Sequence, residues 1–476
     1  MNNKEYIEKI IKKPVSNELI KYFFLDKLTF CCDTNLPLML DNINKFDYLE
    51  PIKKLAEYYG KDSFYNKLYG KVQQQTINKP LIIKEFDYDR DEILLQYSKC
   101  MKNLAILVIW PIAKIDNLQS DPFYEELLSE GEIHAIKYLN MSKKQIQGLI
   151  YQIYYNKPCF KDMNSIISKQ KNLEAYNSNN KIICVFFEAH KPELLSGTDA
   201  NLKVKFRQIL KKTCEVKPNH FLHATDNHTE LQELAQLFCN KNSIRLLQYQ
   251  RIDRIVQNNY SFSKILTMTY KNWLYQNILP IDQLRFMLFS SVVLYSLGLR
   301  NINDLDLIVH YLPKSAKTED FFTLLETFFI NADKFPFVDI SIKGYLGWET
   351  GGEKEYLIEW FEKEWPNLIG SDSMEDMIFN PKYHYYYFGM KIVSLEADTK
   401  RRIKRCRAAA YADIIALMMF TGQLIKIPQL PIGYWENHVY YEFTAEKINS
   451  MIKKIQNYLK LRYRLKLSIE EIKKFF

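Results

Sequence analysis

Glycine and cysteine are scarce in this chain, and neither residue type forms a recognisable binding motif. The 476 residues include 14 glycines. The turn of small residues at Leu195–Asp199, which precedes a basic segment, matches neither a Walker nor a dinucleotide-binding fingerprint. The eight cysteines lie at positions 31, 32, 100, 159, 184, 214, 239 and 406, with no Cys-x-x-Cys pair. We therefore expect reduced, buried thiols, and we exclude a disulfide framework and a cysteine-based zinc site.

Long hydrophobic runs are also missing from the sequence. The longest uncharged apolar run, Phe286–Leu299, is shorter than a membrane span requires, and the first residues contain no apolar core of the signal-peptide type. We expect a soluble protein of a reducing compartment, namely the cytoplasm, or the virion or host cytoplasm if the gene is viral.

Aromatic and basic residues, by contrast, are abundant. With 33 tyrosines, 29 phenylalanines and 47% hydrophobic residues, the chain can bury a large core and is long enough for two to three domains. Its net charge of +9 suits a polyanionic partner without requiring one. Frequent Asn, Lys and Ile residues are typical of an AT-rich genome, such as that of a large DNA virus or of some protists.

Hydrophobic periodicity predicts a multidomain protein of the α/β and α+β classes. Residues 1–98 have mostly helical spacing. Residues 99–250 contain two buried apolar runs, Leu104–Trp110 and Lys181–Phe187, that alternate with helical segments and indicate an α/β domain of unknown role. Residues 251–430 form the domain with the candidate site, and 431–476 form a basic helical segment.

Two carboxylates, Asp304 and Asp306, lie at the start of an apolar run. If 305–311 is a strand, Asp304 and Asp306 project from the same face, because side chains two apart on a strand point the same way. Two such carboxylates repel each other unless a cation lies between them. Mg²⁺ prefers one or two carboxylates together with phosphate oxygens, so this pair is a candidate for a metal–nucleotide complex.

The residues around this pair are consistent with the same site. Residues 291–298 suit a short helix, and Ser290 and Ser291 place hydroxyls and backbone N–H groups at its start, where anions bind. A helix is expected over Thr318–Asn331, followed by a strand over Phe337–Lys343 that carries Asp339. A strand, a helix and a returning strand would set Asp339 beside the other two carboxylates.

The order of these features resembles the nucleotidyltransferase superfamily, typified by DNA polymerase β and the poly(A) and CCA-adding polymerases. In that family a Gly-Gly or Gly-Ser pair binds the triphosphate, the Asp-x-Asp holds two Mg²⁺ ions, and a third Asp helps to activate the attacking hydroxyl. The resemblance covers about residues 284–345. It implies that Ser290 and Ser291 contact the triphosphate, that Asp304 and Asp306 are metal ligands, and that Asp339 is the third catalytic and metal-binding carboxylate.

This chain departs from the family pattern at the serine pair, where neither residue is glycine, and close backbone approach to a triphosphate favours glycine. A simpler interpretation of the Asp-x-Asp is a turn, since 301–304 is rich in turn formers. The order of three carboxylates, with a helix between the strands, favours the nucleotidyltransferase interpretation.

The C-terminal third combines aromatic and basic residues. The tyrosines of Phe379–Lys391 suit stacking on single-stranded bases and suit a wall of core aromatics equally well. Lys400–Arg407 places six positive charges within eight residues, and the last helix, expected over 444–465, adds more. We assign nucleotide binding to Lys391, Arg401 and Arg402, and nucleic-acid binding to Tyr385, Tyr386, Lys404, Arg405, Arg407, Lys453 and Lys454.

Two other places in the α/β region carry suggestive residue types. The turn and basic segment over Ser196–Arg207 could hold a phosphate, although a solvated basic helix face explains it better. His220, His223, Asp226 and His228 are zinc-binding residue types, although a helix capped by Asp226 and Thr229 explains that stretch better.

Together these observations predict a template-independent nucleotidyltransferase that uses an NTP and two Mg²⁺ or Mn²⁺ ions to extend an RNA 3′ end, as in mRNA processing. One alternative is a non-catalytic nucleic-acid-binding or complex subunit with the same fold. Others are a nucleotidyltransferase acting on a protein or small-molecule hydroxyl, and an enzyme centred on the 99–250 domain.

Overall fold

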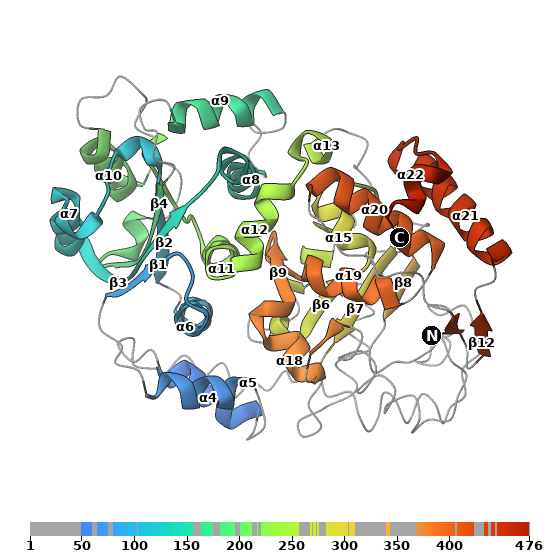
Figure 1. Cartoon of the computed structure of the whole chain (residues 1–476). Coiled ribbons are helices and arrows are strands. Elements are labelled where there is room, and N and C mark those ends of the chain that lie inside the picture. Colours follow the sequence, from blue (N-terminus) through green and yellow to red (C-terminus); the bar gives the residue numbers. More distant parts are fainter. Residues whose placement is uncertain are drawn as a thin grey trace, which may run out of the picture.

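The computed structural model describes residues 49–59, 64–74, 80–101, 103–155, 163–174, 181–195, 200–211, 217, 220–256, 267–268, 270–272, 274–275, 282–302, 304–309, 339–342, 369–371, 373–404, 407–422, 433–436, 439–442 and 445–475. Over these residues the protein is mixed α/β, as its periodicity predicts, with two five-stranded sheets and one two-stranded hairpin (Figure 1).

The first sheet has the strand order β1-β3-β4-β2-β5. Its strands are β1 (Leu81–Lys84), β2 (Leu104–Ile109), β3 (Gly131–Asn140), β4 (Lys181–Ala189) and β5 (Leu222–Ala224). The two predicted apolar runs are β2 and the core of β4, which pair antiparallel, and every residue of β2 is buried. An uninterrupted apolar strand fits this position, because helices cover the sheet.

The first sheet begins earlier than the sequence predicts. Strand β1 and most of helix α6 (Tyr88–Cys100) fall within the region 1–98 that has helical spacing, yet β1 pairs parallel with β3. A strand of four residues is too short to show periodicity, so the predicted boundary at 98 separates β1 from its sheet. Helices α4 (Leu49–Tyr59) and α5 (Phe64–Val72) precede it.

Short polar residues begin the helices of this region. Ser142 and Gln145 form a capping box at α8 (Lys143–Tyr154), in agreement with the predicted start. At α11 (His228–Phe238) the cap is Asn227, which accepts from the Glu230 N–H, and not Asp226 or Thr229 as predicted. The remaining helices of this region are α7 (Pro122–Glu130), α9 (Met163–Glu174), α10 (Asn201–Lys211), α12 (Lys241–Tyr249) and α13 (Ile252–Val256).

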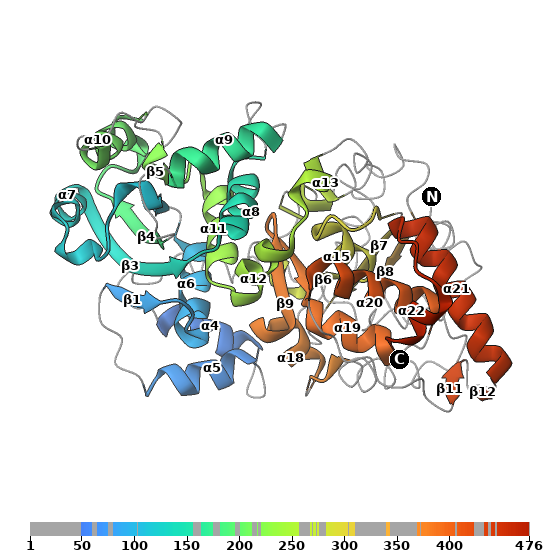
Figure 2. The same cartoon turned by 45° about the horizontal axis from the view of Figure 1, so that its top comes forward.

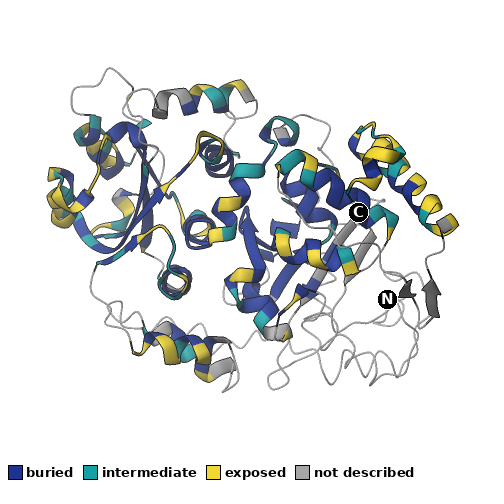
Figure 3. Cartoon of the chain, viewed as in Figure 1, coloured by how far each residue is buried: buried dark blue, intermediate teal, exposed yellow. Residues whose placement is uncertain are grey.

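The second sheet has the order β8-β7-β6-β10-β9. Its strands are β6 (Phe286–Phe289), β7 (Asp304–Val309), β8 (Asp339–Ile342), β9 (His384–Tyr387) and β10 (Met390–Val393). Its helices are α15 (Ser291–Ser296), α18 (Met374–Phe379), α19 (Leu395–Lys404) and α20 (Ala408–Thr421). Most of α20 is buried, as its apolar sequence predicts (Figure 3).

Helices α11 and α12 lie between the two sheets (Figure 2). Hydrogen bonds cross this junction to the edge strand β9. The Asn242 side chain donates to the backbone carbonyl of His384 (3.1 Å), and the Tyr386 N–H donates to the Ser243 hydroxyl (2.8 Å). These bonds give hydrogen-bond partners to backbone groups on the edge of β9, which has no neighbouring strand on that side in its sheet.

Helix α21 (Ala445–Tyr463) packs on α20, and α22 (Ile469–Lys473) packs on α21. The hairpin of β11 (Gly433–Glu436) and β12 (Val439–Glu442) precedes them in the chain. Helix α21 agrees with the predicted last helix, and Ser468 with Glu471 forms the predicted capping box.

Two further expectations concern cysteines and membranes. Cys184 and Cys239 are buried free thiols, and burial raises the pKa of the Cys184 thiol, which suits an inert core residue. Of the helices within the described ranges, none combines the length and the hydropathy that crossing a bilayer demands.

Candidate active site

The turn between β6 and α15 has an unusual backbone. Ser290 has φ 67° and ψ −116°, in the left-handed half of the map that favours glycine. For a non-glycine residue this conformation costs on the order of 1–3 kcal/mol, and such residues persist where their surroundings hold them. Ser291 is buried as the first residue of α15.

Strand register brings this turn to the candidate carboxylates. Strands β6 and β7 are antiparallel with Phe289 opposite Asp306, so Ser290 follows directly at the end of the strand beside the Asp pair. Strands β7 and β8 are parallel with Asp304 opposite Asp339. Neighbouring strands lie about 4.8 Å apart, so these backbone positions meet at one end of the sheet.

The pleat places the three carboxylate positions together. Positions 304 and 306 lie on one face of β7 because residues alternate along a strand, and position 339 shares that face through its pairing with 304. Asp306 is 6% exposed. Carboxylates on one face of adjacent strands are the oxygen ligands that a hard divalent cation prefers.

Two arginines of α19 support the Ser290 turn. The Arg402 guanidinium donates to the Ser290 carbonyl (2.7 Å), and the Arg401 guanidinium stacks 5.3 Å from the centre of the Phe289 ring. Both side chains are buried, at 2% and 4% exposed for Arg401 and Arg402. The strained residue and the residue before it are therefore both held from the same helix.

Buried carboxylates neutralise these arginines. Asp398 accepts from Arg401 (2.7 Å) and from Arg402 (2.6 Å), and Arg402 also pairs with Asp413 of α20. Burial by itself raises the pKa of Asp398, but the charges of Arg402 and then Arg401 outweigh it, so the pKa lies below its usual range. Asp413 accepts in addition from the Tyr463 hydroxyl of α21.

The other end of α15 is fixed as well. The Gln250 side chain donates to the Ser296 carbonyl (2.9 Å), and the Ser296 hydroxyl lies 2.7 Å from the Tyr385 hydroxyl. Gly298 has φ +73°, and a Cβ at this position would lie 2.7 Å from the Arg251 carbonyl, so a glycine is needed there. Both ends of α15 are thus anchored to neighbouring elements.

Three residues assigned to nucleotide binding have internal partners. Arg401 and Arg402 belong to the buried ion-pair network. Lys391 is 4% exposed and donates to the backbone carbonyls of Leu284 and Ile378. Their charged groups have internal partners in this arrangement, and direct contact with a nucleotide stays a prediction.

The aromatic stretch forms part of the core. Tyr385 and Tyr386 are 1% and 2% exposed within the β9–β10 hairpin, so neither ring is accessible to a base in this arrangement, and their assignment to nucleic-acid binding stays a prediction. The competing interpretation, a wall of core aromatics, is confirmed. Tyr387 packs edge-on against Tyr295 of α15 with 6.2 Å between ring centres.

The remaining basic residues lie at the surface. Lys404 and Arg407 are exposed, and so are Lys453 and Lys454 on α21. Arg405 lies outside the described residues, as do the predicted helix Thr318–Asn331 and the segments 310–338 and 343–368. The four exposed cations keep their predicted assignment to nucleic acid as a hypothesis.

The basic helix of the first region has partners of its own. Lys203 pairs with Asp226, and Lys205 pairs with Glu130 (2.6 Å). Arg207 donates through Nε to the Leu222 carbonyl (3.1 Å). With these cations engaged, the phosphate-binding interpretation of Ser196–Arg207 loses its support, while residues 196–199 lie outside the described chain.

Three of the four candidate zinc ligands at 220–228 likewise have other partners. His223 Nε2 lies 3.1 Å from a Glu230 carboxylate oxygen, His228 Nε2 lies 2.8 Å from the Gln232 amide, and Asp226 pairs with Lys203. These contacts favour the structural interpretation of this stretch.

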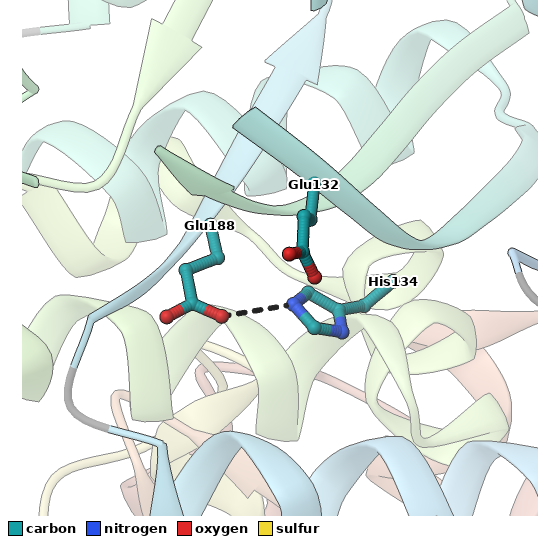
Figure 4. A group of neighbouring side chains, drawn as sticks. All are labelled: Glu132, His134 and Glu188. Carbon is teal, nitrogen blue, oxygen red and sulfur yellow. Dashed lines mark hydrogen bonds and ion pairs between the residues drawn. The ribbon is translucent and has the colours of Figure 1, made fainter. Parts of the chain in front are cut away.

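One cluster of metal-ligand residue types was missed by the sequence reasoning. Glu132, His134 and Glu188 come together where β3 begins and β4 ends (Figure 4). The signal available in the sequence was Glu-x-His at the start of a strand. The third residue of the cluster, Glu188, is 54 residues away from His134, and only the pairing of β3 with β4 brings it close.

Comparison of the chain with protein-family models, with curated proteins and with solved structures found no match.

Proposed function

We propose that this protein is a template-independent nucleotidyltransferase that extends an RNA 3′ end. The observation that carries the proposal is the register of β6, β7 and β8. It sets the Ser290 turn, Asp304, Asp306 and Asp339 at one end of one sheet. Chain order, strand pairing and residue types then agree with the arrangement expected from the resemblance to nucleotidyltransferases.

Each residue has a distinct role in the proposed reaction. Asp304 and Asp306 hold Mg²⁺, which when bound offsets negative charge on the phosphoryl oxygens. The backbone and hydroxyls of Ser290 and Ser291 orient the triphosphate. Asp339 accepts the proton of the attacking hydroxyl as a new bond to the α-phosphorus forms and pyrophosphate departs.

The buried arginines contribute indirectly. Arg402 fixes the Ser290 carbonyl and is itself held by Asp398 and Asp413, so the turn has one defined geometry before any substrate binds. Arg401 and Arg402 are positioning residues and do not touch the nucleotide. The acceptor strand is instead bound by exposed cations such as Lys404 and Lys453.

The test is incubation of the full chain with a short labelled RNA, Mg²⁺ or Mn²⁺ and each of the four NTPs. A ladder of extended products is expected, and it should vanish in the Asp304→Ala/Asp306→Ala variant. A matched control is Glu396→Ala on α19, an acidic residue whose side chain is 72% exposed, and this change should leave the ladder unchanged. Extension that persists in the double variant contradicts the proposed site.

A second candidate function follows from Ser290 itself. A serine at a positive φ narrows the space that a glycine would leave for a triphosphate. This feature favours a non-catalytic RNA-binding or complex subunit. RNA binding of equal strength in the wild type and the double variant, with no extension by either, would support this second function.

Labelling of a protein or small molecule without RNA extension would instead identify a different acceptor hydroxyl.

A further inference from the structure

We propose that Glu132, His134 and Glu188 bind one divalent transition-metal ion, with Zn²⁺ preferred. One ligand atom from each residue can be chosen so that all three lie within 4.8 Å of one another. The side chains converge from the adjacent strands β3 and β4 (Figure 4). The site lies on the first sheet and does not depend on the proposed transferase activity.

One of the ligand distances already matches that of a zinc site. Ligand atoms of a tetrahedral zinc site are about 3.3 Å apart, given bond lengths of about 2.0–2.1 Å. His134 Nε2 and Glu188 Oε2 are already 3.2 Å apart. The Glu132 carboxylate, on the same strand as His134, supplies the third ligand atom, within 4.8 Å of the other two.

Strand pairing explains why a cation is favoured here. Glu132 lies directly opposite Glu188 in the antiparallel pair of β3 with β4. Like charges in that relation destabilise a sheet, and a divalent ion bound by both carboxylates removes the repulsion. Half-buried carboxylates gain more from such an ion than fully solvated ones, and the Glu188 side chain is 12% exposed.

An irregularity of β3 aims the histidine at this pair. The register passes from Ile133 opposite Phe187 to Ala135 opposite Phe186, so His134 is an extra residue at a bulge. Bulges commonly redirect a side chain. The His134 side chain is 1% exposed, so the ring is held inside the cluster.

Tyr97 of α6 orients the imidazole. Its hydroxyl lies 3.3 Å from His134 Nδ1, and the two ring centres are 5.3 Å apart. A hydroxyl that accepts from Nδ1–H leaves the Nε2 lone pair for a metal, the usual arrangement of a metal-bound histidine. Three protein ligands leave a fourth position for water.

The donor set selects among metals. An imidazole with two carboxylates suits Zn²⁺ and Mn²⁺, and affinity for divalent ions rises from Mn²⁺ to Zn²⁺. Mg²⁺ prefers oxygen ligands in an octahedral site and should compete poorly. This preference separates the cluster from the Asp304 site, where Mg²⁺ is proposed.

The experiment is zinc titration by calorimetry, with elemental analysis after gel filtration, on the full chain stripped with a chelator. About one tightly bound zinc per chain is expected, and it should be retained by the Asp304→Ala/Asp306→Ala variant. The variants Glu132→Gln, His134→Ala and Glu188→Gln should each lose at least about tenfold in zinc affinity, and Tyr97→Phe about tenfold.

His223 provides a matched control, because it is also a buried histidine 3.1 Å from a glutamate but belongs to no such cluster within the described part of the chain. His223→Ala should leave zinc affinity unchanged. The two Glu→Gln changes preserve side-chain shape, so they still report on the site if His134→Ala fails to fold. The absence of zinc binding at micromolar concentration, or equal affinity in both Glu→Gln variants and the wild type, would show that His134 and Glu188 form a hydrogen-bonded pair only.

Discussion

Two sets of cations in the C-terminal third have opposite surroundings. Arg401 and Arg402 are buried and neutralised by Asp398 and Asp413, whereas Lys453 and Lys454 on α21 are exposed. In the sequence both sets read as basic runs suited to phosphate. The difference teaches that a cation with a buried carboxylate partner stabilises the chain itself, and that exposed cations are the ones left for an outside anion.

Helical spacing places buried and exposed cations on opposite sides of α19 within the single basic run Lys400–Arg407. Asp398 stands three and four residues before Arg401 and Arg402, so these three share the inner face of α19. Lys400 and Lys404 lie on its outer side, where Lys400 is 49% exposed. A run of charges therefore need not act as one unit.

Removal of Asp398 should produce the largest effect. Asp398→Ala leaves two buried guanidinium groups without their shared carboxylate, and we expect the free energy of unfolding to fall by about 3–5 kcal/mol. Urea denaturation followed by circular dichroism measures this change. The control is Glu396→Ala on the exposed side of α19, expected within about 0.5 kcal/mol of the wild type. Equal losses for the two variants would contradict the buried network.

Acid should break the same contact in the wild type. The pKa of Asp398 in the folded state lies below its ordinary value of 3.8. At pH values between these two pKa values, the folded state therefore binds fewer protons than the unfolded state. The stabilisation is complete above about pH 4–5 and is lost as the pH falls through the folded pKa. The difference in unfolding free energy between wild type and Asp398→Asn should stay constant from neutral pH to that point and then shrink. A difference that grows in acid would contradict this sign.

A smaller effect is expected at Ser290, where the buried network meets the candidate site. Ser290→Gly relieves a backbone cost of about 1–3 kcal/mol but adds about 0.4–1 kcal/mol of chain entropy to the unfolded state. We expect net stabilisation of about 1 kcal/mol in thermal or urea unfolding. Ser290→Ala removes the same hydroxyl and keeps the strain, so it should not stabilise. If both variants behave alike, the hydroxyl and not the backbone governs this turn.

The sequence predicts the strands better than it predicts the partners of the charged side chains. The apolar run of β2 and the Asp-x-Asp strand β7 each agree with the prediction within one or two residues, because a run of apolar residues is visible locally in the sequence. The carboxylate partners of Arg402 are Asp398, visible at helical spacing, and Asp413, which reaches it only through the packing of α19 on α20. The pairing of Glu132 with Glu188 likewise depends on strand register, which one sequence does not encode locally.

The exposed cations should have the smallest effect on stability and should act on binding alone. Lys453→Glu/Lys454→Glu is expected to change the free energy of unfolding by less than about 0.5 kcal/mol, because both side chains are exposed on α21. If these lysines contact single-stranded RNA, the variant should weaken binding and lower the slope of log K against log salt by about 0.7 for each lost phosphate contact. Fluorescence anisotropy with a labelled RNA at several salt concentrations measures both quantities. Lys143→Glu/Lys144→Glu on α8 carries the same change of charge at two exposed positions, so an equal loss there would show that net charge, and not the α21 surface, attracts the RNA.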